Sequence, residues 1–264
     1  MRRICLLLVL GLLNAQAAMR VLVTVVEQKT SRPITDLQAS DFTFLEDKLP
    51  RRVEAAEFAS KPIDVMLLVD TSLVGPMVQP IAGALIAELK DKEQMAIVAF
   101  DSSAEMIQDF TSSKETLHSA LGRVKYGNTP RVLDALFAAM ESGFDHATFR
   151  RVIFLVTTGF EGGGRVSERE VVRLARRQSV SIYPIYAVGG ERGLFESLAR
   201  QTGGASFNLR ELARSAVKQP AQHIFEVARG AYTLTLTGNL GLGEKLKVEV
   251  KRPQKLFVSA LPLD

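Results

Sequence analysis

The chain has 264 residues, of which 33 are Lys or Arg and 29 are Asp or Glu, so its formal net charge at pH 7 is +4. This near-neutral balance gives no support for nucleic-acid binding, which requires a strongly basic surface. The only cysteine is Cys5, near the N-terminus. The rest of the chain therefore offers neither a disulfide nor a cysteine-ligated metal site, and its core must stabilise the fold.

Residues 1–17 have the features of a secretory signal peptide. Two arginines precede an apolar run at 4–13, and Ala-Gln-Ala at 15–17 supplies an A-x-A cleavage site. A membrane anchor is the alternative, but about ten apolar residues are too few to cross roughly 30 Å of hydrocarbon. The cysteine lies inside the run, which argues against lipid attachment. We expect an exported protein, periplasmic or secreted, with no membrane span after cleavage.

The segments at the two ends of the remaining chain have β patterns. Residues 18–60 contain "MRVLVTVVE", a turn at "KTSRP", and "DFTFLEDKLPRRVEAAEF", in which Phe42 and Phe44 alternate with polar residues. Residues 229–264 contain "AYTLTLTGNLGLGEKLKVEV", a hairpin-like pattern around a turn rich in Gly and Asn. The two ends could therefore pair into one small β domain that flanks the central block.

Residues 61–228 alternate apolar strands with amphipathic helices. The strands "IDVMLLV", "MAIVAF", "RVIFLVT" and "VSIYPIYAV" are continuous apolar runs, as strands covered on both faces require. "AEMIQDF" is a further short strand that would form an edge hairpin with "MAIVAF". This alternation predicts an α/β fold with a doubly wound, mostly parallel, Rossmann-like sheet. The helical patterns fall near 76–90, 113–122, 130–143, 167–178 and 192–202, with a last helix at 210–228 interrupted at Pro220.

Polar side chains stand where the predicted strands end. Asp70 and Ser72 follow the first strand, and Thr129 ends the loop "YGNTP" before the helix at 130–143. In an open parallel sheet, ligands bind beyond the carboxyl ends of the strands. Oxygen ligands from these three residues would suit a hard cation such as Mg²⁺.

The stretches "VMLLVD" with its D-x-S, "GNTPRVLDAL" and "VIFLVTTGFEGG" together resemble the von Willebrand factor type A (VWA) domain. The resemblance implies a metal-ion-dependent adhesion site built from D-x-S-x-S, a threonine in a G-x-T loop and an aspartate in a T-D-G turn. An acidic residue of a partner would complete the coordination. More closely, the chain after residue 17 resembles the secreted VWFA-related proteins typical of Acidobacteria, including their β-rich ends.

Compared with this motif, the chain keeps Asp70, Ser72 and Thr129 but departs twice. Val74 stands in place of the second serine, and Thr158 stands in place of the T-D-G aspartate. Each lost partner costs about 10–100-fold in metal affinity, so a roughly micromolar site would become a ~0.1–10 mM one. We expect a degenerate remnant site and no cofactor other than weakly bound Mg²⁺.

Two other carboxylates could restore metal binding. Glu161 lies three residues beyond Thr158, and Asp101 follows "MAIVAF" at the same edge of the predicted sheet. Recruitment of either would give a functional Mg²⁺-dependent adhesion site, which is the alternative interpretation.

The retained motif residues also have structural interpretations. Asp70 would accept backbone N–H bonds in its own turn. Ser72 would cap the helix that begins near Pro76. Thr129 before Pro130 has the pattern of an N-cap followed by proline at the first helical position.

Signatures of an enzyme are weak. His118, His146 and His223 lack metal-ligand spacing, and the glycine run at 162–164 lacks the Lys-Ser/Thr of a P-loop. There is no G-x-S-x-G nucleophile elbow. We expect a non-enzymatic protein; a hydrolase that uses metal-activated water is the alternative, although no base for it is visible.

The loops at the predicted strand ends carry the candidate partner-binding residues. Leu73, Val74, Met77 and Phe160 would present apolar surface there, with Glu161 beside them, unless they pack beneath the loops. Such a patch among polar loops marks an interaction site. The sequence therefore predicts a protein-binding or cell-adhesion module outside the cytoplasm, and a structural component of an envelope assembly is a further alternative.

Overall fold

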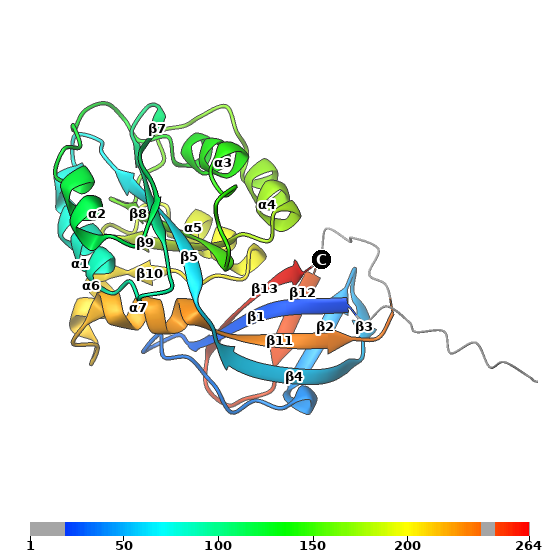
Figure 1. Ribbon diagram of the computed structural model, residues 1–264. Coiled ribbons are helices and arrows are strands. Elements are labelled where there is room, and N and C mark those ends of the chain that lie inside the picture. Colours follow the sequence, from blue (N-terminus) through cyan, green and yellow to red (C-terminus); the bar gives the residue numbers. More distant parts are fainter. Residues whose placement is uncertain (1–18, 239–245, 264) are drawn as a thin grey trace, which may run out of the picture.

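A computed structural model of the chain describes residues 19–238 and 246–263. The predicted signal peptide and most of the Gly-rich turn near 240 lie outside these residues. Figure 1 shows two units side by side, an α/β unit and a β-rich unit to which both end segments of the described chain belong. The predicted α/β fold with flanking β structure from both ends is confirmed.

The α/β unit is built on a six-stranded sheet in which neighbouring strands are parallel, except for the antiparallel pair at one edge. That edge pair is the hairpin predicted from "MAIVAF" and "AEMIQDF". All eight residues of the central strand are buried, as a strand covered on both faces requires. In spatial order the strands are β10 (Phe207–Asn208), β9 (Ser181–Tyr186), β8 (Arg150–Thr157), β5 (Ile63–Asp70), β6 (Met95–Phe100) and β7 (Ala104–Thr111).

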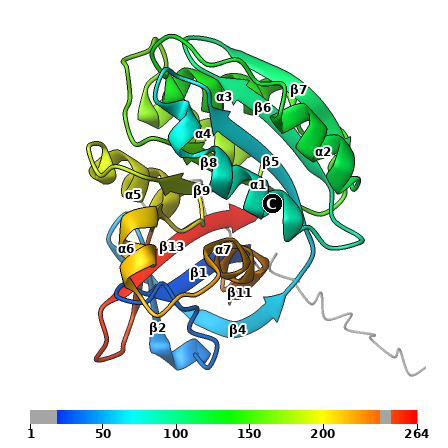
Figure 2. The same cartoon turned by 90° about the vertical axis from the view of Figure 1, so that its left-hand side faces the viewer.

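Helices cover both faces of this sheet (Figures 1 and 2). Alternate residues of β5 divide between the two layers, because Leu67 belongs to one core and Met66 to the other. The first layer contains α1 (Gln79–Ala87), α2 (Lys114–Leu121) and α7 (Pro220–Arg229); the second contains α3 (Val132–Ser142), α4 (Glu168–Arg177) and α5 (Arg192–Gln201). The short η2 (Gly75–Met77) precedes α1, and α6 (Leu209–Arg214) follows β10. None of the helices in the described ranges is long and apolar enough to cross a membrane.

The β unit consists of two antiparallel sheets packed face to face. Strand β1 lies between two strands from the C-terminal segment, with Val21 opposite Leu234 on one side and Val23 opposite Ala260 on the other. Phe44 from the smaller sheet is fully buried against them. One sheet has the order β13 (Leu256–Leu263), β1 (Met19–Glu27), β11 (Gly230–Leu236), β4 (Val53–Ser60); the other has the order β12 (Leu246–Val250), β2 (Phe42–Glu46), β3 (Leu49–Arg51), and η1 (Ala39–Asp41) precedes β2.

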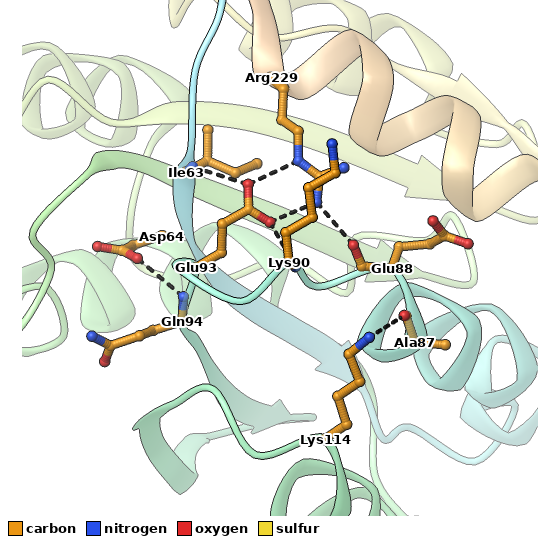
Figure 3. A network of polar contacts seen from close by, with 9 residues as sticks. All are labelled: Ile63, Asp64, Ala87, Glu88, Lys90, Glu93, Gln94, Lys114 and Arg229. Carbon is orange, nitrogen blue, oxygen red and sulfur yellow. Dashed lines mark hydrogen bonds and ion pairs between the residues drawn. The ribbon is translucent and has the colours of Figure 1, made fainter.

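A buried ion pair holds the point where the chain enters and leaves the α/β unit (Figure 3). Nε of Arg229 donates to Oε1 of Glu93 at 2.8 Å, and Nη2 donates to Oε2 at 2.5 Å. The same Nη2 donates to the carbonyl of Glu88 at 2.8 Å. The Glu93 carboxylate also accepts from the backbone N–H groups of Ile63 and Lys90 at 3.3 and 3.1 Å. The charges are thus paired and hydrogen-bonded, as burial requires.

The two crossing segments also pair directly at this point. The N–H of Lys61 donates to the carbonyl of Arg229 at 3.1 Å, and Ser60 lies opposite Gly230 in the β4–β11 ladder. Because both crossings lie side by side, the α/β unit is an insertion between β4 and β11 of the β unit.

The units also contact each other through the loop after α5. The hydroxyl of Thr24 donates to the carbonyl of Gly203 at 2.8 Å, and that of Ser259 donates to the carbonyl of Gly204 at 2.5 Å. The contacts are buried and join residues far apart in the sequence. They therefore fix the face of the β1–β13 pair against the α/β unit.

The Arg229→Ala variant tests the buried ion pair. We expect the free energy of unfolding to fall by about 3–5 kcal/mol, because Glu93 would keep a buried charge without its partner. Urea unfolding of residues 18–264 measures the change. The matched control is Lys247→Ala, which removes the exposed Lys247–Glu249 pair and should cost about 0–1 kcal/mol.

A Glu93→Leu, Arg229→Met double variant should be less destabilised than Arg229→Ala, since it leaves no unpaired charge. Equal losses from the double variant and from Arg229→Ala would contradict this account of the junction.

Candidate functional site

Three loops meet at the edge of the sheet where β5, β6 and β8 end. The loop before α3 bonds to the loop after β5, because the N–H of Gly127 donates to the carbonyl of Thr71 at 2.9 Å. The same loop accepts from the loop after β8, where the N–H of Gly162 donates to the carbonyl of Pro130 at 2.8 Å. The sequence predicted this convergence from the strand order of parallel sheets.

Asp70 is fully buried at the end of β5, and four donors satisfy its carboxylate. Oδ1 accepts from the N–H of Ser72 at 2.9 Å. Oδ2 accepts from the hydroxyl of Thr157 at 3.1 Å, and from the N–H and hydroxyl of Thr158 at 2.9 and 2.8 Å. The structural interpretation of Asp70 is therefore confirmed. The side chain at the lost aspartate position serves as a hydrogen-bond donor to the aspartate that remains.

Ser72 is buried, and its Oγ has no hydrogen-bond partner among the described residues. The prediction that it caps the following helix is wrong: the N-cap of η2 is Val74, and no side chain caps it. The cause is the tight turn that Gly75 allows, because the N–H of Gly75 bonds to the carbonyl of Ser72 at 2.8 Å. The N-cap of η2 thus lies two residues beyond Ser72.

Two functional neighbours of Asp70 were missed by sequence reasoning. Thr157 donates to its carboxylate, and the Tyr126 ring lies against the backbone at Gly75, where a Cβ would collide with it. The hydroxyl of Tyr126 is buried without a partner among the described residues. Burial, with a smaller contribution from the Asp70 charge, raises the pKa of Tyr126. In the sequence, only the pair of threonines before Gly159 pointed to Thr157.

Thr129 is exposed and does not cap α3, so that prediction is wrong as well. The helix begins at Val132 with Arg131 at the N-cap. The physical reason is that the carbonyl of Pro130 is used by Gly162 of the neighbouring loop. The Thr129 methyl group also occupies the space that a side chain at Gly162 would need, which explains the glycine there.

Glu161 caps α3 instead of restoring a metal site. Its Oε2 accepts from the N–H groups of Val132 and Leu133 at 2.7 and 3.2 Å, where the positive end of the helix dipole favours a carboxylate. Burial raises the pKa of Glu161, although the backbone N–H bonds, including one from Gly163, oppose the shift. One oxygen of this carboxylate therefore holds the helix start, whereas Oε1 is buried without a hydrogen-bond partner among the described residues.

Asp101 is also engaged within its own turn. Its Oδ2 accepts from the side-chain amide of Asn128 at 2.9 Å, and Oδ1 accepts from the N–H of Ser103 at 3.1 Å. Partial burial alone would raise the pKa of Asp101, but these hydrogen bonds, led by that from Asn128, lower it overall. The side chain thus ties the β6–β7 turn to the loop before α3.

Among the three retained motif residues, the Asp70 carboxylate is the only charged group that could hold a divalent cation. Mg²⁺ requires about six oxygens in an octahedron, yet the Asp70 carboxylate already accepts four hydrogen bonds. Within the described ranges, no group of three or more His, Cys, Asp or Glu side chains could hold a metal. Three buried polar atoms at this edge have no hydrogen-bond partner among the described residues and favour a ligand there: Oγ of Ser72, the hydroxyl of Tyr126 and Oε1 of Glu161.

The same loops expose apolar side chains, which we call the loop patch: Leu73, Val74, Met77 and Phe160. They are 76%, 48%, 55% and 48% exposed, respectively, and account for four of the seven exposed large hydrophobic residues in the described ranges. The alternative that they pack beneath the loops is therefore wrong. Apolar surface concentrated on loops at one end of a sheet is typical of an interaction site.

The model of the von Willebrand factor type A domain matches residues 64–235, so the chain belongs to this family. Its members often act in protein interaction. No curated protein matches the chain in sequence. Among solved structures, proximal thread matrix protein 1 (PTMP1) from the mussel byssus, with a zinc-occupied MIDAS motif, has a TM-score of 0.56 and 15% identity over 70% of this chain and 50% of its own.

A von Willebrand factor type A protein from Catenulispora acidiphila is similar over more of the chain. The TM-score is 0.52 at 12% identity, and the alignment covers 93% of this chain and 74% of that protein. At such identities the likeness shows a shared fold. This chain spans about half of the mussel protein, so the activity of that whole protein is not transferred.

The Thr158→Val variant tests the role of threonine beside Asp70. It keeps the shape but removes one hydroxyl donor to a buried carboxylate, so we expect a loss of about 1.5–3 kcal/mol in the free energy of unfolding. Thermal and urea unfolding measure the loss. Thr129→Val is the matched control and should change stability by less than about 0.5 kcal/mol, because Thr129 is exposed. If Thr158→Val leaves the free energy of unfolding unchanged, other donors must satisfy the Asp70 carboxylate.

Proposed function

We propose that this protein is an exported, non-enzymatic VWA module that binds a protein partner through the loop patch without a bridging metal. The observation that carries the proposal is the saturation of the Asp70 carboxylate by four protein donors, beside four exposed apolar side chains. In this proposal the adhesion site is degenerate, and its remaining residues keep the loops in place.

The chemistry of the neighbouring loop residues indicates the kind of partner. Lys125, Arg131 and Arg165 are exposed on the loops that flank the loop patch, whereas the carboxylates of Glu161 and Asp101 accept hydrogen bonds from their own loops. A few well-packed residues supply most of the binding energy in protein interfaces, and charges at the rim steer the partner. These features favour a partner surface with apolar residues and acidic neighbours.

Export is proposed from residues 1–17 alone, whose signal-peptide pattern is described above. The closer resemblance to the secreted VWFA-related proteins of Acidobacteria agrees with export and stays a prediction. The proposal of export does not depend on the loop patch, so either proposal can fail without the other.

A functional Mg²⁺-dependent adhesion site is the second candidate, because the buried Oγ of Ser72 has no partner among the described residues. Calorimetric titration of residues 18–264 with Mg²⁺ and Mn²⁺ distinguishes this metal-dependent site from metal-independent binding through the loop patch. We expect no heat of binding at micromolar concentrations from the natural protein, since two ligand positions are occupied by Val74 and Thr158. Tight binding would overturn the metal-independent proposal.

The positive control for this titration is the Val74→Ser, Thr158→Asp double variant. Its second carboxylate should repel Asp70 in the absence of metal and lower the melting temperature, which Mg²⁺ should then raise by binding the folded state. Metal-dependent stabilisation of the variant alone would mean that the scaffold is intact and that these two residues removed the ion.

The loop patch is tested by crosslinking the exported protein to its partner in the producing cells. We expect a specific crosslinked species to persist in EDTA and to be lost in a Leu73→Asp, Phe160→Asp variant, because charges would enter the apolar contact. Leu49→Asp is the matched control, since the exposed fraction of Leu49, 66%, lies between those of Leu73 and Phe160, and Leu49 lies on β3 of the other unit. Loss of the species in EDTA, or its loss in the control, would contradict the proposal.

A further inference from the structure

A second candidate site lies at the junction of the two units, away from the loop patch. A cavity of about 720 Å³ is lined by the end of β1 and its turn, the start of β13, and residues of α5, β10 and α6. This volume falls within the range of about 300–1,000 Å³ typical of small-molecule sites. Each wall therefore comes from a different unit, a position where ligand sites often occur.

The floor of this junction cavity is apolar. Val26, Leu212 and Phe257 line the cavity and are largely buried in the adjoining core. Side chains in the core cannot turn away, so the floor has a fixed shape. A ligand lying on it would bury apolar surface between the two charged walls.

The wall from the α/β unit carries an excess of negative charge. Arg192 donates from Nε to Glu196 and from Nη1 to Glu211, each at 2.7 Å. One guanidinium thus holds two carboxylates at the cavity, which leaves one negative charge uncompensated. The pairing also fixes both carboxylates in place, because a guanidinium presents its donors in a rigid fork.

The wall from the β unit carries an excess of positive charge. Lys29 and Lys255 line the cavity, and neither forms an ion pair with another residue that the structure describes. The one carboxylate on this side is that of Glu27, which accepts from the hydroxyl of Thr30 at 2.5 Å within its own turn. Two cations therefore face the cavity with one anion beside them.

From the opposite charges of the two walls, we propose that the junction cavity binds a zwitterionic peptide of about three residues. The ammonium group of the peptide lies towards Glu196 and Glu211, its carboxylate lies towards Lys29 and Lys255, and its side chains cover the floor. A tripeptide, about 10 Å long when extended, carries its two opposite charges at its two ends. This site is separate from the proposed loop patch and does not depend on it.

The test uses residues 18–264 labelled with ¹⁵N and titrated with trialanine, whose two ends carry opposite charges at neutral pH. We expect amide shifts concentrated on residues that line the cavity, with saturation in the millimolar range, about −4 kcal/mol in free energy. N-acetyl-trialanine amide, which has neither charge, should bind about tenfold more weakly or not at all.

Two variants make the outcome specific. The Lys29→Glu, Lys255→Glu variant should weaken trialanine binding about tenfold, whereas Lys218→Glu, a charge reversal at an exposed lysine outside the cavity, should leave it unchanged. Leu73→Asp should also leave it unchanged, because the loop patch is not involved. Equal binding of the blocked peptide, absence of shifts, or an unaffected double lysine variant would each overturn the proposal.

Discussion

The ion pair between Glu93 and Arg229 is the contact on which the arrangement of the two units depends. It joins the loop before β6 to the last residue of α7, at the place where the chain passes between the units. An inserted unit needs only its two crossing segments to be held together, and here both crossings bond to one another and to this pair. Gly230 begins β11 directly after Arg229 and lies opposite Ser60 of β4.

Strand β5 has a buried aspartate at each end, Asp64 at its start and Asp70 at its end. At the start of β5, Asp64 accepts from the N–H groups of Gln94, Thr148 and Phe149 at 3.1, 2.6 and 2.8 Å. At the end, Asp70 does the same for Ser72 and Thr158. Loops that leave a parallel sheet have backbone donors without strand partners, and a carboxylate satisfies several at once. Both aspartates thus have a structural use that requires no ligand.

Hydrogen bonds within the protein hold the three loops together. The carboxylate of Glu161, which the sequence offered as a replacement ligand, holds the start of α3. Asp70 and Thr158 are joined by hydrogen bonds, whereas the Oγ of Ser72 has no partner among the described residues. The large side chains that these loops expose are apolar. This apolar surface is the basis of the proposed function.

Much of the fold could be predicted from the sequence, because continuous apolar strands alternating with amphipathic helices have few other solutions. Five of the six strands of the α/β unit, including its edge hairpin, and the break near Pro220 were predicted, whereas the two-residue strand β10 was not. The helix caps were predicted less well. Ser72 and Thr129 have the residue types of caps, but the capping carboxylate of α3 comes from Glu161, 29 residues away from Val132. No local pattern contains a contact made between separate loops.

The sequence by itself determined which chemistry is present: one aspartate at the end of the first strand of the α/β unit, a valine and a threonine at two ligand positions, and apolar residues in the loops. Only the tertiary structure decided how these groups are used. It gave the Asp70 carboxylate its four donors, left Leu73 and Phe160 in solvent, and brought Lys29 and Glu211 to the lining of one cavity. The physical reason is that burial, hydrogen bonding and charge pairing depend on distances between residues far apart in the chain, which composition and periodicity do not contain.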